Sequence, residues 1–362
     1  MHRCCPFTLA ALTLALGCGG ESSKIEQADT AAATTTETGS STTTGSTTGT
    51  TTGTTTGTTT GTTTGTSTGS STTSPTDTAT STGTPPPAFE GCLAPQGPVN
   101  DERFMIKAGG MEREYRLTVP DVDPETPLPL VIAIHGADGR NFPFNQQPRW
   151  EELARDEGII LAYPLSELVR PNEGEWQLNT RADMMHDIDF MNALIDEISN
   201  RHCVDAGRVY ATGYSLGSMF NYELACHMND RFAAIASVAG TMPVDPNTCD
   251  IIDPVPILHV HGRRDPIISY TDEWDWKEWD PVGTMRDIPG LIDYWGGRYG
   301  CGSESSTELE DSLYVVMDDC DNPDVRVEHH MIREGNHDWP LQINGTSTHQ
   351  VLWDFMQQFS KP

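Results

Sequence analysis

The chain has 362 residues, with 22 basic and 52 acidic side chains and a formal net charge of −30. Two of the basic and five of the acidic residues precede residue 89, so residues 89–362 carry a net charge of −27. Such an acidic surface repels phosphate backbones and argues against nucleic-acid binding and polyanionic substrates. It is also the surface of a protein that stays soluble outside the cell.

Residues 1–17 have the pattern of a secretory signal, with Arg3 followed by a short apolar stretch and then small residues. The apolar stretch is too short to span a bilayer as a mature helix. Its end resembles a bacterial lipobox, with Ala15 where leucine is usual, and we expect a lipid on Cys18. An ordinary signal peptide cleaved nearby is the alternative. We therefore expect an exported protein, either a lipoprotein of the outer membrane or cell surface that meets the membrane only through this lipid, or a secreted one.

Residues 18–88 consist almost entirely of Thr, Gly and Ser after the first dozen positions. With so few apolar residues, nothing offsets the entropy cost of ordering this segment, and we expect a disordered tether. About 70 such residues have an average reach of roughly 45 Å. The length of residues 89–362 suits one α/β catalytic domain with a sizeable core.

Apolar runs alternate with segments of helical periodicity through this domain. The apolar runs predict buried strands at 128–134, 158–163, 208–212, 233–238, 255–260 and 325–332. Helices are expected at 149–157, 187–200, 218–226, 287–299 and 347–359. This alternation predicts a doubly wound, mostly parallel sheet with helices on both faces, which binds ligands at the carboxyl ends of its strands.

Six of the nine cysteines fall in the domain, and an even number in an exported chain indicates disulfides. Fifteen pairings are possible for six cysteines. We favour two pairs that are close in sequence, which leaves a third; the set is Cys92–Cys203, Cys226–Cys249 and Cys301–Cys320. A metal site is a poor alternative because no Cys-x-x-Cys pair is present.

The pentapeptide Gly-Tyr-Ser-Leu-Gly at 213–217 lies between an expected strand and an expected helix. A serine on a tight turn in that setting is the nucleophile elbow of an α/β-hydrolase, where the glycines allow close backbone approach. The five-residue pattern also arises by chance, so the assignment of Ser215 as a nucleophile depends on its surroundings.

The partners of such a serine follow in the order acid, then histidine. Asp265 comes just after the apolar run 255–260, and His337 just after the run 325–332. Both therefore fall at the strand edge that carries Ser215. We expect His337 to take the serine proton and return it to the leaving group, while Asp265 fixes the imidazole tautomer.

Other residues compete for these two roles. Asp272 and Asp287 lie further along the chain, but neither directly follows a buried strand. His329 and His330 fall inside an expected strand.

No cofactor and no metal are expected. His259 and His261 resemble a two-ligand metal pair, but a third ligand is not evident, which favours a packing role.

Stabilisation of an oxyanion requires hydrogen-bond donors already in place. The backbone N–H of Leu216, at the head of the helix after the elbow, is one expected donor. The N–H of Ala137, in the loop after the strand 128–134, is the other. His135 is expected to brace that loop by hydrogen bonding.

Aromatic residues near these motifs are candidates for the substrate pocket: Tyr214, Trp339 and Trp274. Trp339 suits packing equally well. Trp274 belongs to the tryptophan-rich segment 272–279, which fits either a stacking platform or a capping loop.

Together these residues give a resemblance to the secreted polyhydroxybutyrate depolymerase and feruloyl esterase group of α/β-hydrolases, covering about residues 91–359. The stretches that carry it are 129–136, 203–205 with 208–212, the elbow, 255–262 with Asp265 and Pro266, and 335–340. The resemblance implies the same triad, and it implies hydrolysis of a polyester or of a plant-wall feruloyl or acetyl ester. Leu216 and Ser218 depart from the Asn and Gly usual in that group, which bears on substrate preference.

The sequence therefore predicts an exported serine esterase acting on an ester substrate, which can be polymeric. A peptidase of the same fold and a non-catalytic carbohydrate-binding module are the alternatives. A complete Ser-Asp-His set argues against the binding module, because binding alone does not need it.

Overall fold

The computed structural model describes residues 92, 95–137, 147–170, 173–276 and 282–362, all within one unit, Thr82–Pro362. The expected signal, Cys18 and the tether lie outside the described residues. In the described ranges no helix has the length and apolarity to cross a membrane.

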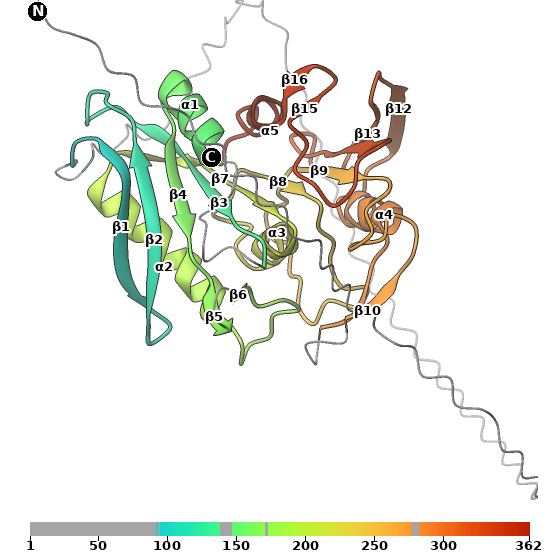
Figure 1. The fold of residues 1–362 in the computed structure, drawn as a ribbon, viewed down its shortest axis with the longest axis horizontal. Helices are drawn as coiled ribbons and strands as arrows, with labels where there is room; N and C mark the ends of the chain where they lie inside the picture. Colours follow the sequence, from blue (N-terminus) through green and yellow to red (C-terminus); the bar gives the residue numbers. More distant parts are fainter. Residues whose placement is uncertain (1–91, 93–94, 138–146, 171–172, 277–281) are drawn as a thin grey trace, which may run out of the picture. The chain divides into compact units, whose positions relative to one another are not determined.

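A ten-stranded sheet organises the described part of the chain, in the order β1-β2-β4-β3-β7-β8-β9-β14-β13-β12 (Figure 1). Its six central strands are parallel: β4 (Ile160–Pro164), β3 (Leu128–Ile134), β7 (Val204–Tyr214), β8 (Ala234–Val238), β9 (Ile257–Gly262) and β14 (Val327–Ile332). All six central strands were expected from the sequence, with bounds that differ by a few residues. The mostly parallel, doubly wound sheet of an α/β-hydrolase fold is confirmed.

The two edges of this sheet are antiparallel hairpins that the sequence did not predict. β1 (Val99–Ala108) pairs with β2 (Met111–Val119), and β12 (Ser303–Glu308) pairs with β13 (Ser312–Asp318). β12 is an edge strand that forms hydrogen bonds on one side only, with β13, and all six of its residues are exposed. The polar sequence of β12 therefore lacks the apolar run that identifies a central strand, whereas the apolar run 313–317 of β13 was a signal that sequence reasoning missed.

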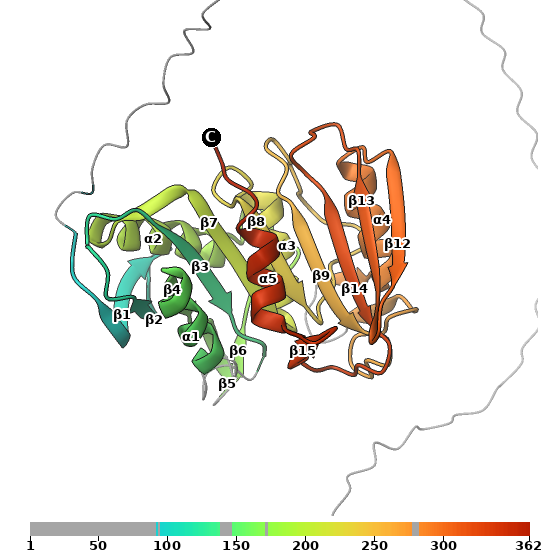
Figure 2. The ribbon, with the colours of Figure 1, turned by 90° about the horizontal axis from the view of Figure 1, so that it is seen from above.

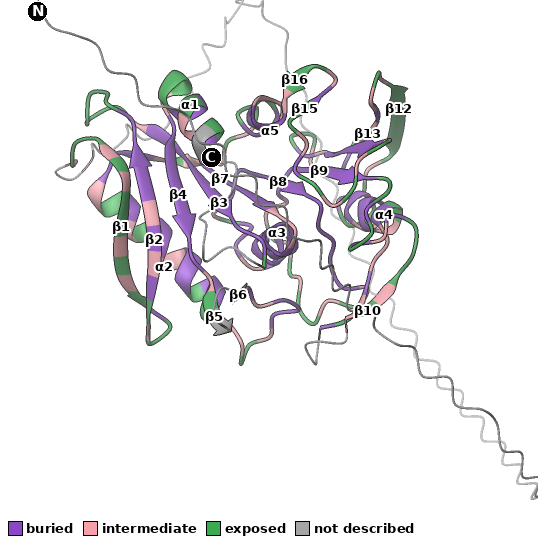
Figure 3. Cartoon of the chain, in the orientation of Figure 1, coloured by how far each residue is buried: buried purple, intermediate pink, exposed green. Residues whose placement is uncertain are grey.

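Helices cover both faces of the sheet (Figure 2). One face packs against α2 (His186–Arg201), α3 (Leu216–His227) and α4 (Ile288–Arg298). The other packs against α1 (Gln147–Glu157) and α5 (Thr348–Met356). Figure 3 shows the central strands as buried between these two layers.

Side-chain caps explain where two of the helices begin. Asp287 accepts a hydrogen bond from the backbone N–H of Gly290 at the start of α4, and Ser347 accepts one from Gln350 at the start of α5. Each cap satisfies a backbone donor that has no partner within the helix.

Three two-stranded ribbons lie outside the main sheet: β5 (Glu167–Arg170) with β6 (Glu173–Glu175), β10 (Trp274–Trp276) with β11 (Gly283–Met285), and β15 (Gln342–Ile343) with β16 (Thr346–Ser347). The second of these contains Trp274 and Trp276 of the tryptophan-rich segment, whose residues 277–279 lie outside the described ranges.

The six domain cysteines form three disulfides, Cys92–Cys203, Cys226–Cys249 and Cys301–Cys320. These are the pairs favoured from the sequence. The second ties the end of α3 to the loop before β9, and the third ties the end of α4 to the end of β13.

Candidate active site

Ser215 lies on a strained turn between β7 and α3. Its backbone has φ of 53° and ψ of −119°, a conformation that costs energy for a residue with a side chain. The Ser215 N–H donates to the carbonyl of Val238 at 3.0 Å, which fixes the turn to the neighbouring strand β8.

The glycines on either side of Ser215 are required by backbone contacts. A Cβ at Gly213 would lie 2.4 Å from the carbonyl oxygen of Gly217. A Cβ at Gly217 would lie 2.3 Å from the carbonyl oxygen of Ile134, at the end of β3. The turn can therefore form only because both positions lack side chains.

Two further loops at the same sheet edge bring an acid and an imidazole to Ser215. Asp265 follows β9 and His337 follows β14, as predicted from the apolar runs. His337 lies with Nε2 2.9 Å from the Ser215 Oγ and with Nδ1 2.7 Å from the Asp265 Oδ2. The three side chains thus form one hydrogen-bonded series from carboxylate to hydroxyl.

The carboxylate of Asp265 is buried, accepts three hydrogen bonds and has a fourth polar contact, with His261. Its Oδ1 accepts from the backbone N–H groups of Ile267 and Ile268, both at 2.8 Å. Its Oδ2 accepts from His337 and lies 3.2 Å from the Nε2 of His261. Burial by itself raises the pKa of Asp265, but the hydrogen bonds from His261, His337 and Ile268 outweigh it and hold the pKa well below its usual value.

The expected oxyanion donors flank this series. Leu216 is the first residue of α3, and Ala137 is an exposed residue just after β3. A Cβ at Gly136 would lie 3.3 Å from the Cβ of Ser215, so the loop after β3 runs directly beside the serine. The role of the Leu216 and Ala137 N–H groups as oxyanion donors stays a prediction.

His135 braces that loop through three hydrogen bonds. The N–H of Ser166 donates to its Nε2 at 3.1 Å, which leaves the proton on Nδ1 to donate to the carbonyl of Gly136 at 2.6 Å. The indole of Trp176 donates to the His135 carbonyl at 3.0 Å. This geometry agrees with the bracing role expected from the sequence.

The candidate pocket aromatics have different surroundings. The Tyr214 hydroxyl donates to the His337 carbonyl at 2.7 Å, and its ring contacts Trp339 at a centroid distance of 6.4 Å. Trp339 is 6% exposed and packs in the core beneath α1 and α5. Both residues therefore support the His337 loop.

Trp274 lies in β10, where its half-buried ring contacts Trp276 at 5.3 Å. Met285 of the partner strand β11 pairs with Pro243, which comes after the carboxyl end of β8. The ribbon is thus joined to the sheet edge that carries Ser215. A substrate contact by Trp274 remains a prediction.

His329 and His330, which competed for the role of the base, lie inside a strand as expected, whereas His261 lies inside β9 and not just past the strand expected at 255–260. His329 and His330 are buried residues of β14, and His259 and His261 are buried residues of β9. Within the described ranges no group of three His, Cys, Asp or Glu side chains is arranged to hold a metal ion. Sequence reasoning missed the contact between His261 and Asp265, although the alternation His-Val-His was a signal that the two imidazoles share a face.

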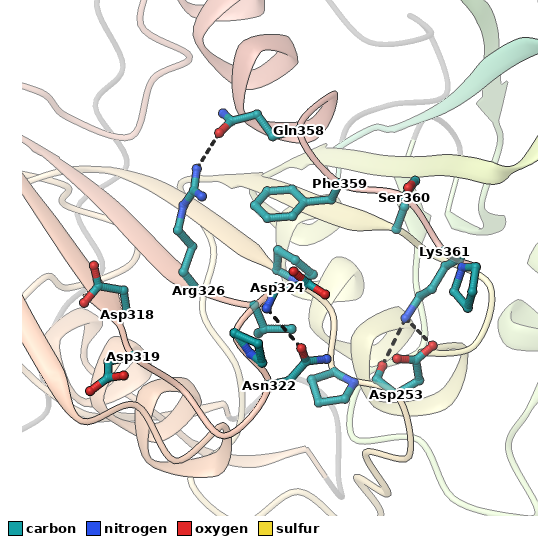
Figure 4. A pocket seen from close by; sticks show the side chains of 16 residues that line it. Asp253, Asp318, Asp319, Asn322, Asp324, Arg326, Gln358, Phe359, Ser360 and Lys361 are labelled. Carbon is teal, nitrogen blue, oxygen red and sulfur yellow. Dashed lines mark hydrogen bonds and ion pairs between the residues drawn. The ribbon is translucent and has the colours of Figure 1, made fainter. Parts of the chain in front are cut away.

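A cleft of about 980 Å³ lies at the amino ends of the central strands, opposite the ends that carry Ser215 (Figure 4). It is lined by residues that precede β8, β9 and β14 and by the C-terminal segment, where Lys361 pairs with Asp253 at 2.7 Å and Arg326 donates to Gln358 at 2.7 Å. Ser215 follows the carboxyl end of its strand, so this cleft is remote from the series of three side chains.

The sheet order and the strained serine turn define an α/β-hydrolase fold, with a serine, an acid and a histidine at one edge. No family model matches the chain.

Curated proteins similar to this chain carry esterase names. The bifunctional acetylxylan esterase/xylanase of Neocallimastix patriciarum is 24% identical over 241 residues, covering 64% of this chain and 31% of that protein. Feruloyl esterase B of Piromyces equi is 25% identical over 237 residues, covering 65% and 42%. Feruloyl esterase C of Emericella nidulans is 30% identical over 164 residues, covering 43% and 56%. The chain thus matches about a third to somewhat over half of the length of these relatives. Two of them are feruloyl esterases, in agreement with the resemblance found from the motifs.

Solved structures similar to this chain are more distant. The acetyl xylan esterase of Aspergillus awamori is 14% identical with a TM-score of 0.49, covering 71% of this chain and 99% of that one. A ferulic acid esterase of Anaeromyces mucronatus is 12% identical with a TM-score of 0.42, covering 72% and 90%. Sequence identities and TM-scores this low do not indicate the substrate or the activity of this chain.

Proposed function

We propose that this chain is a serine esterase in which Ser215, His337 and Asp265 form the catalytic triad. The observation that carries the proposal is the position of His337, whose two ring nitrogens lie within hydrogen-bond distance of the other two side chains, at 2.9 and 2.7 Å. An arrangement with the base between a strained serine and a buried acid serves acyl transfer.

The reaction follows from these positions. As the Ser215 Oγ bonds to the ester carbonyl carbon, its proton passes to the His337 Nε2, and the carbonyl oxygen becomes an oxyanion. His337 then protonates the departing alcohol, leaving an acyl group on Ser215. A water molecule, deprotonated by His337, attacks this acyl group; the bond between the acyl carbon and the Ser215 Oγ breaks, His337 returns the proton to Oγ, and the carboxylic acid is released. Asp265 stays ionised throughout and stabilises the imidazolium.

The backbone N–H groups of Leu216 and Ala137 are proposed to stabilise the oxyanion. Leu216 N–H is at the N-terminus of α3, where the helix dipole favours negative charge. Loss of one such donor typically raises the barrier by about 3–4 kcal/mol.

We assign the substrate class as a feruloyl or acetyl ester of a plant-wall polysaccharide. The names of the curated relatives support this class, and the acidic domain favours uncharged substrates over polyanions. Two exposed apolar residues flank the triad loops, Ile267 near Asp265 and Leu341 near His337. They offer an apolar contact to an aromatic acyl group or to the polyester of the depolymerase alternative.

Hydrolysis of p-nitrophenyl acetate by the purified protein tests the activity, with Ser215→Ala as the control. Hydrolysis that disappears in S215A, together with fluorophosphonate labelling confined to Ser215, supports the proposal, and equal rates in both proteins would refute it. A panel of methyl ferulate, acetylated xylan, short polyhydroxybutyrate and tributyrin then ranks the substrate classes. A peptide amide in the same panel tests the peptidase alternative.

We also propose export of the chain with lipid attachment at Cys18. Three disulfides support an oxidising compartment, and the sequence around Cys18 supports lipidation. Growth with radiolabelled palmitate should label the protein and not its Cys18→Ala variant. An unlabelled wild-type chain in the culture medium would instead indicate plain secretion.

A further inference from the structure

A second series of buried side chains reaches the same oxygen of Asp265 that faces His337, Oδ2. The Tyr222 oxygen lies 2.7 Å from the His259 Nδ1, and the His259 Nε2 lies 3.1 Å from the His261 Nδ1. The His261 Nε2 lies 3.2 Å from the Asp265 Oδ2 and 3.1 Å from the carbonyl oxygen of Ile268. The series joins helix α3, which begins at the elbow, to the loop that carries the acid.

Strand geometry explains why these residues meet. His259 and His261 are two apart on β9, so both side chains point to the same face of the sheet. Helix α3 packs on that face, and Tyr222 is fully buried between the two. His329 pairs with His259 in the parallel register of β14 and β9 and donates from Nδ1 to the His259 carbonyl at 3.0 Å.

The acceptors at one end fix the direction of every hydrogen bond in the series. The His261 Nε2 faces the Ile268 carbonyl and the Asp265 carboxylate, both acceptors, so in neutral His261 this nitrogen carries the proton. The His261 Nδ1 then accepts from the His259 Nε2, and the His259 Nδ1 accepts from the Tyr222 hydroxyl. Burial raises the pKa of Tyr222 and lowers that of His259, so this phenol stays protonated and this imidazole neutral.

We propose that His261 is a positioning residue for Asp265, and that His259 and Tyr222 hold it in the Nε2–H tautomer that it needs for this task. The inference rests on the proposed esterase function. With the two backbone N–H groups on Oδ1 and two imidazoles on Oδ2, rotation of the carboxylate would break hydrogen bonds at both oxygens. Asp265 is therefore held in the orientation that presents Oδ2 to His337.

The imidazole of His329 holds Tyr270, which lies further along the loop that carries Asp265. Tyr270 donates to the His329 Nε2 at 3.1 Å, and the backbone of Tyr270 accepts from Ile288 at the start of α4. The acid loop is thus tied to β14 as well as to β9. This second tie leaves the loop in place when the contact from His261 is removed, so the effect on the carboxylate can be separated from loss of the loop.

Variants of His261 test the role by comparing kcat with KM for a p-nitrophenyl ester. His261→Gln places an amide N–H near the position of Nε2 and should keep kcat within about threefold of wild type. His261→Leu removes the donor and should lower kcat about 10- to 100-fold with KM changed less than threefold. His330→Leu is the control, because His330 is a buried histidine of the neighbouring strand β14 that contacts Ser312 and Tyr314 on β13, away from Asp265.

Rates are referred to the concentration of sites labelled by fluorophosphonate, so that loss of folded protein does not count as loss of kcat. Equal kcat in H261L and H330L, or a loss in H261Q as large as in H261L, would overturn the proposal. If H261L does not fold, Tyr222→Phe replaces it, with an expected kcat loss of about 3- to 10-fold, and an unchanged kcat would count against the proposal.

Nitrogen-15 NMR of the full chain labelled at histidine tests the tautomers without any substrate. Both His259 and His261, assigned by their variants, should give the Nε2–H pattern. An Nδ1–H pattern or an imidazolium pattern at neutral pH would overturn the assigned direction. Because this measurement needs no activity, a failure of the esterase proposal stays distinguishable from a failure of the tautomer assignment.

Discussion

Tyr214, the residue before the nucleophile, donates a hydrogen bond from its hydroxyl to the backbone carbonyl of His337 at 2.7 Å. The elbow therefore holds the loop of the base as well as the serine itself. Since the His337 ring also lies 5.4 Å from the Tyr214 ring, the position of the imidazole depends on this tyrosine in two ways.

Replacing Tyr214 by phenylalanine should lower kcat about 3- to 10-fold with little change in KM, because the base loses one constraint while the substrate contacts remain. The free energy of unfolding should fall by about 1 kcal/mol, the usual contribution of such a hydrogen bond. Tyr210→Phe is the matched control, since its hydroxyl donates to the Phe359 carbonyl at 2.8 Å near the other edge of the sheet. Steady-state kinetics of both variants test whether the Tyr214 hydroxyl positions His337. An equal fall of kcat in the two variants would mean that the loss of activity comes from general destabilisation.

Replacing Asp265 by asparagine should lower kcat by about three to four orders of magnitude while the protein stays folded. An asparagine at this position can present an N–H to His337 and favour the wrong imidazole tautomer, which removes the base from Ser215. Asp338→Asn, an exposed position beside His337, should leave kcat within about twofold. A D265N variant that retains more than a tenth of wild-type kcat would exclude Asp265 as the orienting acid.

The central sheet could be predicted from sequence because its strands are buried on both faces and read as unbroken apolar runs. The positions of Asp265 and His337 followed from the same runs, since each comes just after one. The edge strand β12 could not be predicted in this way, because it is exposed at every residue and its sequence is polar. Its partner β13 has the apolar run 313–317, which sequence reasoning overlooked.

The surroundings of the acid were less accessible from sequence. His259 and His261 suggested either a metal pair or packing, and a short alternation of imidazoles cannot distinguish these from a hydrogen-bonded series. The distinction depends on Tyr222 and Asp265, which reach the same histidines from α3 and from a loop, and such tertiary contacts leave no local pattern.

The substitution Gly217→Ala, which adds one methyl group, should abolish activity and lower the free energy of unfolding by about 3 kcal/mol. The new Cβ would lie 2.3 and 2.5 Å from the carbonyl oxygens of Ile134 and His135, and backbone atoms of a central strand cannot move away without loss of packing. Gly297→Ala is the control, because an exposed position in α4 has nothing within 4 Å of its Cβ and gains up to about 1 kcal/mol of helix propensity. Urea unfolding and esterase activity of the two variants test this contrast; a folded, active G217A would contradict the close approach of α3 to β3.

Buried histidines make the stability of the protein depend on pH. Burial lowers the pKa of His329 to about 3 and that of His330 to about 4, so both are neutral in the folded chain near pH 6. In the unfolded chain each takes up a proton below its ordinary pKa of 6.5. The stabilisation is therefore fully present above pH 6.5 and is lost as the pH falls toward 4 and 3.

Below pH 6.5 each of these groups should reduce the free energy of unfolding by up to about 1.4 kcal/mol per pH unit. Urea unfolding at pH 8, 6.5, 5.75 and 5 measures the slope, and comparison with a variant separates the histidine from Asp187 and Glu223, whose pKa values burial raises. His330→Gln should flatten the slope by about one proton, because the amide does not titrate, while Tyr210→Phe should shift the curve without changing its slope. Equal slopes in wild type and His330→Gln between pH 6.5 and 5 would mean that His330 takes up its proton in the folded chain as readily as in the unfolded chain, contrary to its burial in β14.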